Sequence, residues 1–121
     1  MSMREYGIKG FGITKRHLKL NYKKIEKKVG HKVTEDDFYD NEIFEEMLGN
    51  TPIETIWNDY DFYLLINDCP PWEHNWHEDL KNIKNKDDAI NYFWENFKNF
   101  VDNTEEDFKS HLDFIDDTYC G

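Results

Sequence analysis

The stretch YDFYLLI at residues 60–66 contains the longest unbroken run of apolar residues in the chain, from Phe62 to Ile66. Its aromatic and aliphatic side chains favour a β-strand. The turn-forming sequence NDCPP at residues 67–71 predicts where that strand ends. The run is also far shorter than the roughly 20 apolar residues that cross a bilayer as a helix. We therefore expect residues 60–66 to form a buried strand of a soluble domain.

A second strand is expected at residues 6–13, where apolar side chains recur at Tyr6, Ile8, Phe11 and Ile13. Glycines lie between them, and glycine weakens a strand because it has no side chain to pack. The wider spacing between Ile8 and Phe11 predicts a bulge near Gly10.

Most of the remaining chain has the apolar spacing of amphipathic helices. The clearest helix begins at the capping residue Asn85 and continues to residue 101. Further helices are expected at 14–29, 35–48, 71–83 and 104–119, with a short helical turn at 51–54. Together these elements predict an α+β fold, a mostly helical single domain of about four to five helices. Its small sheet is expected to have two or three strands, with the helices on one face.

A chain of 121 residues fits one domain, residues 1–121, and is too short for two ordinary ones. Charged residues make up 34% of the sequence and the net charge is −11, yet 17% aromatic residues can supply a core. Residues 1–33 hold ten bases and two acids, whereas residues 34–121 hold five bases and 24 acids. The acidic remainder repels nucleic acid and anionic membranes and attracts basic proteins.

The sequence carries no strong catalytic motif. Ser2 and Ser110 are the only serines, and neither has the glycine context of a hydrolase nucleophile. Cys69 and Cys120 form no C-x-x-C pair, and no export signal is evident, so we expect free thiols in a reducing cytoplasm. These features predict a cytoplasmic protein that is not an enzyme and needs no cofactor.

One cluster could bind a metal ion. On a helix, His74 and His77 would share a face, and Glu78 would lie one turn after His74. Two imidazoles and a carboxylate suit zinc or ferrous iron. The alternative is a surface helix in which Trp72 and Trp76 turn inward and the histidines meet solvent. We favour the second interpretation, because the spacing differs from the His-Glu-x-x-His motif of metalloproteases.

Aromatic residues among the acids indicate a surface for a protein partner. Aromatic anchors surrounded by charge are typical of tight protein interfaces. The residues predicted to bind a partner are Tyr39, Glu42, Glu45, Glu46, Trp57, Asp59, Tyr60 and Asp61.

In composition, the chain resembles bacterial toxin-immunity proteins, which are small acidic inhibitors, and phage-encoded inhibitors that mimic nucleic acid. We favour an immunity protein that neutralises a nuclease-type toxin, because the aromatic content suits an interface that recognises specific side chains. A mimic of nucleic acid needs only regularly spaced acids. The first alternative is a phage inhibitor of the anti-CRISPR or anti-restriction type. The others are a metal-binding protein or metal-dependent enzyme using His74, His77 and Glu78, and a structural or regulatory subunit that binds a partner through its aromatics. A basic protein, rather than nucleic acid or a membrane, is the expected partner.

Overall fold

The computed structural model describes residues 5–39, 42–57, 61–66, 70–73 and 76–120, of which residues 5, 6, 39 and 117–120 are described by their backbone alone. Within these ranges, four antiparallel strands form one sheet in the order β2-β3-β1-β4. They are β1 (Glu5–Thr14), β2 (Ile53–Trp57), β3 (Phe62–Ile66) and β4 (Asp113–Cys120). The predicted strands at 6–13 and 60–66 correspond to β1 and β3. The expected sheet of two or three strands is wrong, because β2 and β4 were predicted as helical.

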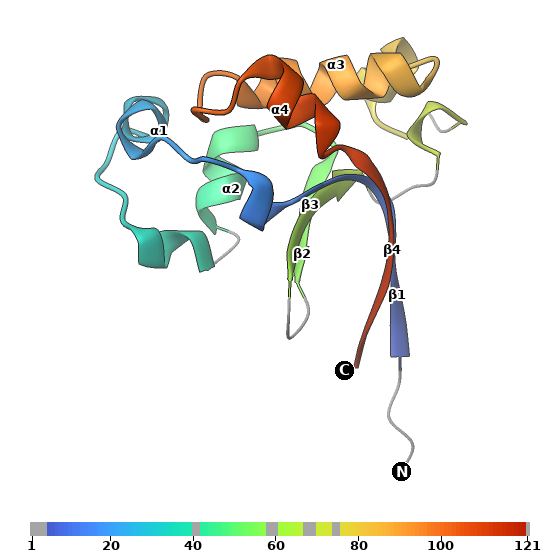
Figure 1. Cartoon of the computed structure of the whole chain (residues 1–121), viewed down its shortest axis with the longest axis horizontal. Helices are drawn as coiled ribbons and strands as arrows, with labels where there is room; N and C mark the ends of the chain where they lie inside the picture. The colour runs from blue at the N-terminus through green and yellow to red at the C-terminus, as the bar shows by residue number, and fades with distance from the viewer. Residues whose placement is uncertain (1–4, 40–41, 58–60, 67–69, 74–75, 121) are drawn as a thin grey trace.

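The α-helices of the described ranges are α1 (Tyr22–Val29), α2 (Glu42–Leu48), α3 (Lys86–Phe97) and α4 (Glu105–Ser110). Short 3-10 helices occur at Lys15–His17, Glu35–Tyr39, Pro71–Glu73 and Glu78–Asn82. Figure 1 shows the helices gathered at one end of the molecule, while β1 and β4 run side by side away from them toward the two termini.

The predicted helix at 104–119 is wrong beyond residue 110. Its apolar residues Phe108, Leu112, Ile115 and Tyr119 have helical spacing, but α4 ends at Ser110 and β4 follows. β4 pairs with β1 from Glu5 opposite Cys120 to Gly12 opposite Asp113. Without β4, the backbone amide and carbonyl groups along one edge of β1 would have no strand partner. This long-range pairing overrides the local helical pattern.

The predicted helices at 14–29 and 71–83 are also shorter and interrupted. Residues 19–21 instead run antiparallel to residues 100–102, with a β-bridge between Leu20 and Val101. The α-helix therefore begins only at Tyr22, where the Asn21 side chain accepts a hydrogen bond from the Lys24 amide. It ends at Gly30, which has a φ of 82°. The expected helical turn at 51–54 is wrong, since Ile53 begins β2.

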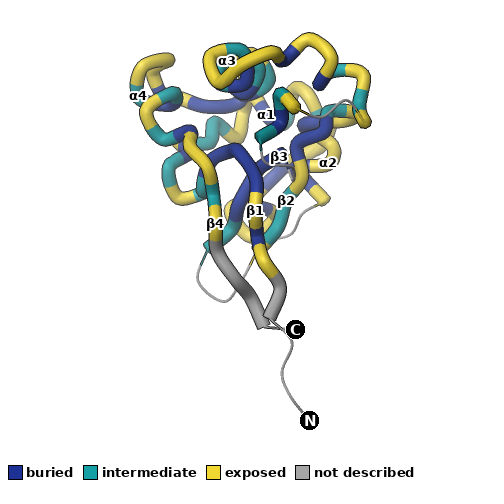
Figure 2. The backbone as a smooth tube through the Cα atoms, turned by 90° about the vertical axis from the view of Figure 1, so that its right-hand side faces the viewer, coloured by how far each residue is buried: buried dark blue, intermediate teal, exposed yellow. Residues whose placement is uncertain are grey.

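The sheet is buried on both faces in its central part (Figure 2). The helix-covered face carries Phe11, Ile13, Leu64 and Ile66, which belong to the main core. The helices add the buried aromatic side chains Phe44, Phe93, Phe97 and Phe108 to that core. The opposite face has a smaller cluster, formed by Ile8, Tyr63 and Leu65 with Ile56 and Ile115 packed against it.

Glycines bring β1 and β3 unusually close together. A Cβ atom at Gly12 would lie 2.0 Å from the Leu64 carbonyl oxygen, and one at Gly10 would lie 2.3 Å from that of Ile66. No side chain fits at such distances. The sequence suggested that these glycines weaken the strand, but in the structure they allow the two strands to approach each other.

Candidate partner-binding surface

Helix α2 carries three of the carboxylates predicted to bind a partner. Its residues Ile43, Phe44, Met47 and Leu48 are buried, so they fix the helix against the core. Glu42, Glu45 and Glu46 occupy the remaining positions and are exposed. Gly49, with a φ of 55°, ends the helix and turns the chain toward β2.

Glu46 is held by a neighbouring segment. Its carboxylate is 2.7 Å from Nε2 of His31, and Nδ1 of His31 is 3.0 Å from the Lys32 carbonyl oxygen. These two hydrogen bonds, the one to Glu46 first, raise the pKa of His31 above its ordinary value. Each ring nitrogen of His31 faces a hydrogen-bond acceptor, and both nitrogens can donate only when the imidazole is protonated. Protonated His31 therefore forms an internal ion pair with Glu46.

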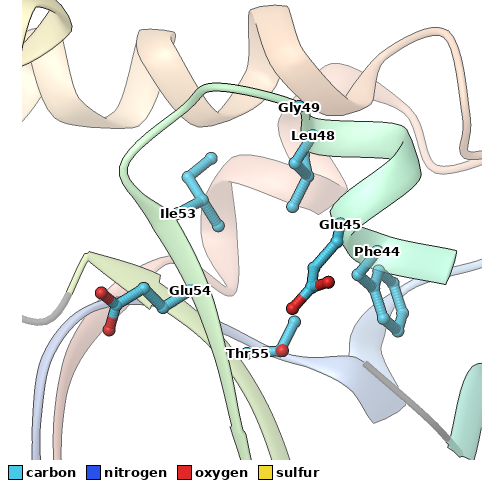
Figure 3. Close-up of a pocket in the computed structure, with 7 residues that line it drawn as sticks. All are labelled: Phe44, Glu45, Leu48, Gly49, Ile53, Glu54 and Thr55. Carbon is cyan, nitrogen blue, oxygen red and sulfur yellow. The ribbon is translucent and has the colours of Figure 1, made fainter. Parts of the chain in front are cut away.

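Glu45 borders a groove between α2 and β2. The groove has a volume of about 250 Å³ and is lined by Phe44, Glu45, Leu48, Gly49, Ile53, Glu54 and Thr55. Figure 3 shows the Glu45 carboxylate directed across the groove toward Thr55, while Glu54 points away on the other side of the strand. The groove therefore combines apolar walls with a carboxylate and lies beside a strand at the end of the sheet.

Trp57 lies at the end of β2 and is 51% exposed. Its ring stacks on Phe62 of β3, with centroids 5.8 Å apart and planes within 8°. Phe62 in turn contacts Phe44 of α2, with ring centroids 5.4 Å apart. The partly buried ring of Phe62 and the buried ring of Phe44 thus hold Trp57 in place on the helix-covered face while leaving half of its surface available.

Two other predicted residues that the structure describes have different surroundings. Asp61 lies 3.3 Å from Arg16 in an ion pair that links the residue before β3 to the 3-10 helix after β1. Tyr39 is the last residue of a 3-10 helix, and its backbone alone is described. Asp59 and Tyr60 lie outside the described residues. The structure therefore places Glu45 on the groove and connects Trp57 to α2 through Phe62 and Phe44, while Glu42 lies one turn before Glu45 on the same helix.

Sequence reasoning missed that groove because it placed residues 51–54 in a helical turn. The pattern Thr51-Pro52-Ile53-Glu54 fits a helix N-terminus. The β-branched and aromatic residues of Ile53–Trp57 were the signal that could have identified a strand.

Of the three candidate metal ligands His74, His77 and Glu78, the structure describes His77 and Glu78. His77 caps the 3-10 helix Glu78–Asn82, and its Nδ1 accepts from the Asp79 amide at 3.1 Å. Its Nε2 bonds the Asn50 carbonyl oxygen, so both ring nitrogens are engaged. His74 lies outside the described residues, and those that are described contain no group of three or more potential ligands suited to a metal ion.

A second cluster of titratable groups joins the 3-10 helix Lys15–His17 to the end of α4. The rings of His17 and His111 stack with centroids 4.0 Å apart, and His111 lies 3.5 Å from Asp107. Burial is the main cause that lowers the pKa of His17, followed by the facing His111 and by Arg16. Asp61 and Asp107 act on His17 in the opposite direction.

Asn103 supports this cluster from beneath and is 6% exposed. It accepts a hydrogen bond from the Lys19 amide at 2.7 Å and donates to the His17 carbonyl oxygen and the Asp107 carboxylate. The bond to Asn103 is the largest influence that lowers the pKa of Asp107. These contacts serve the packing of the fold.

Comparisons with protein-family models, curated proteins and solved structures gave no match. Among the described residues, no helix has the length and apolar character needed to cross a membrane.

Proposed function

We propose that this protein is a small acidic cytoplasmic inhibitor that binds and blocks a basic protein, as a bacterial immunity protein blocks a nuclease-type toxin. The supporting observation is the surface formed by Glu42 and Glu45 of α2, the groove beside β2, and Trp57. Trp57 is half-exposed and is connected through Phe62 and Phe44 to the helix that bears the exposed carboxylates, and aromatic anchors near acids are typical of a binding hot spot for a cationic partner.

The balance of charge supports the same proposal. Helix α2 has three acids and no base, and the whole chain has a net charge of −11. Such a surface speeds encounter with a basic protein by long-range attraction, and a bound inhibitor covers the groove through which a nuclease handles its substrate. A phage inhibitor that mimics nucleic acid remains the alternative, but the groove and Trp57 favour recognition of specific side chains over a row of negative charges.

Charge reversal tests the proposal. Wild-type protein, a Glu42→Lys, Glu45→Lys variant and a control Glu73→Lys, Glu106→Lys variant are each used to capture partners from the native host at low salt. The control changes the net charge equally, through exposed acids on other elements. The captured protein is then purified, and both its association rate and the inhibition of its nuclease activity are measured.

The α2 variant is expected to associate at least tenfold more slowly and to show weaker salt dependence, since steering depends on charge at the docking face. The control is expected to associate at nearly the wild-type rate and to inhibit the nuclease stoichiometrically. Equal association by both variants, or a partner that is not basic, would refute the proposal.

A further inference from the structure

We propose that the exposed lysine face of α1 is a second contact surface for the same partner, and that it fits an acidic patch beside the partner's basic surface. The lysine face consists of Lys23, Lys24, Lys27 and Lys28. This inference rests on the proposed function, because it specifies which basic proteins the inhibitor accepts and which it rejects.

The fold presents the four lysines together on one side of α1. Ile25 is fully buried in the main core, and Tyr22 stacks on the buried Phe38 with ring centroids 5.2 Å apart. These contacts fix the rotation of the helix, so the positions opposite Ile25 turn toward solvent. All four lysines are exposed. Glu26, the only acid of the helix, instead accepts a hydrogen bond from the Val33 amide at 2.9 Å.

No acid among the described residues neutralises the lysine face. None of the four lysine side chains takes part in an ion pair or a hydrogen bond with a residue that the structure describes. This is so although the chain contains 26 acids. Balance of charge within the described fold therefore does not account for the lysine face.

The stability of the helix accounts for the lysine face only in part. Lys27 and Lys28 lie in the last turn, where positive charge is favourable beside the negative end of the helix dipole. Lys23 and Lys24 lie in the first turn, where the same charge is unfavourable, and that turn contains no acid. Each of these two also has a second lysine four residues later, a spacing at which like charges repel. Binding of an anionic surface relieves both costs.

The lysine face belongs to a helix that adjoins acidic α2. The two helices are neighbours in the fold (Figure 1). The segment after α1 connects them, because His31 bonds Glu46 of α2 while Lys32 beside it is exposed. A typical interface buries about 800 Å² of each partner and so extends well beyond one short helix. A protein that docks on α2 therefore also meets α1, and it fits both when its surface is basic opposite α2 and acidic opposite α1.

Such a mixed pattern of charge provides specificity. A uniformly acidic surface attracts every basic protein, whereas the lysine face repels those whose surface is basic throughout. The pattern selects a partner whose basic surface is bordered by Asp and Glu residues, and the lysines then contribute attraction in place of repulsion.

Neutral variants test the inference by the direction of the change in affinity. The α1 variant carries the substitutions Lys23→Gln, Lys24→Gln and Lys27→Gln. Glutamine and lysine have similar helix propensities, so α1 is retained. The control removes the same charge from exposed lysines elsewhere in the fold, through Lys9→Gln, Lys81→Gln and Lys84→Gln. Dissociation constants are measured for the partner captured from the host and for two unrelated basic proteins, lysozyme and cytochrome c.

The α1 variant is expected to bind the captured partner at least fivefold more weakly, because the acidic patch of the partner loses its counterions. It is expected to bind lysozyme and cytochrome c at least threefold more tightly, because the repulsion is gone. A general gain of negative charge would instead strengthen binding of all three basic proteins. The control is expected to bind the captured partner with an affinity within about twofold of the wild type.

Zero-length cross-linking locates the contact directly. A carbodiimide joins a lysine amine to a carboxylate that it touches, with loss of water, and mass spectrometry of the cross-linked complex identifies both residues. We expect links from the lysine face to a cluster of Asp and Glu residues on the captured partner, and none from Lys81 or Lys84. Retained amide NMR dispersion in each variant shows that the fold is intact.

Several results would overturn the inference. They are unchanged or tighter binding of the captured partner by the α1 variant, no gain in binding of lysozyme and cytochrome c, or cross-links that avoid the lysine face. A dimer seen in sedimentation that the α1 variant loses would assign the face to a second copy of this chain. Binding of an oligothymidylate that the α1 variant loses would assign it to nucleic acid.

Failure of this inference is distinguishable from failure of the proposed function. If any of these results occurs while charge reversal on α2 still slows the captured partner, only the contact with the lysine face is lost. If charge reversal on α2 has no effect while the lysine face is cross-linked to the captured protein, the proposed function fails and the lysine contact stands.

Discussion

The stacked imidazoles of His17 and His111 make stability depend on pH. Burial and the facing cationic groups lower the pKa of His17 in the folded protein, whereas the unfolded chain keeps a value near 6.5. The unfolded state therefore binds a proton more readily as the solution is acidified. The stability that His17 contributes is fully present above about pH 6.5 and is lost as the pH falls through the folded-state pKa.

His31 has the opposite effect, because the Glu46 carboxylate raises its folded pKa. Its contribution is present below about pH 6.5 and is lost as the pH rises. Asp107 has a lowered pKa, so its contribution disappears only in more acidic solution, below the range of either histidine.

We expect the free energy of unfolding to fall less between pH 7.5 and 5.5 in His17→Gln than in the wild type. In His31→Gln it should fall more than in the wild type. Urea unfolding followed by tryptophan fluorescence at the two pH values measures both differences. An unchanged pH dependence in His17→Gln would show that protonation of this ring does not distinguish the folded and unfolded states.

At the scale of the element, strand β1 depends on its glycines. Substitution Gly12→Ala places a methyl group against backbone atoms of β3, including the Leu65 Cα at 2.6 Å, so the two strands must separate. We expect a loss of about 3 kcal/mol in the free energy of unfolding, at the upper end of the usual range for overpacking. Urea denaturation measures the loss.

Gly7→Ala is the matched control on the same strand. The nearest atom to its added Cβ would be the flexible Lys9 Cε at 3.9 Å. The expected change is within about 0.5 kcal/mol, as for other exposed positions. Similar losses in the two variants would show that glycine matters in β1 for strand propensity and not for close approach.

The elements that the sequence predicted well are those whose signal lies within their own residues. The helix Lys86–Phe97 shows its own cap at Asn85, which accepts from the Asp88 amide, and its own apolar stripe. The strand Phe62–Ile66 is apolar throughout. Residues 113–120 were predicted incorrectly because Ile115 and Tyr119 fit a helix until β1, over 100 residues away, is taken into account.

The candidate surface, like the fold, could be predicted from the sequence only in part. The exposure of Glu42, Glu45 and Glu46 follows from the apolar stripe on α2, which can be seen in the sequence. The groove could not be foreseen, because it exists only where β2 lies beside α2 at the end of the sheet. The partnerships of Glu46 with His31 and of Asp61 with Arg16 likewise join segments distant in sequence.

At the scale of the whole molecule, the pairing of β1 with β4 holds the domain together. Truncation after Leu112 would remove every residue pair of that ladder and the contact between Phe114 and Phe11, whose ring centroids are 5.3 Å apart. We expect the truncated chain to lose its near-ultraviolet circular dichroism and its dispersed amide NMR spectrum. Removal of residues 1–4, which precede the ladder, is the control and should preserve both. A folded truncated chain would show that the helices and the β2–β3 hairpin form an independent unit.

During biosynthesis, the β1–β4 ladder can form only after β4 has been synthesised. Strand β1 is synthesised before its partner β4, and the paired residues are more than 100 positions apart in the chain. At about 5–20 residues per second, that interval lasts roughly 5–20 s. During this interval the nascent chain exposes the outer edge of β1 to neighbouring chains. We therefore expect aggregation to begin on polysomes, where several nascent copies of this chain lie close together.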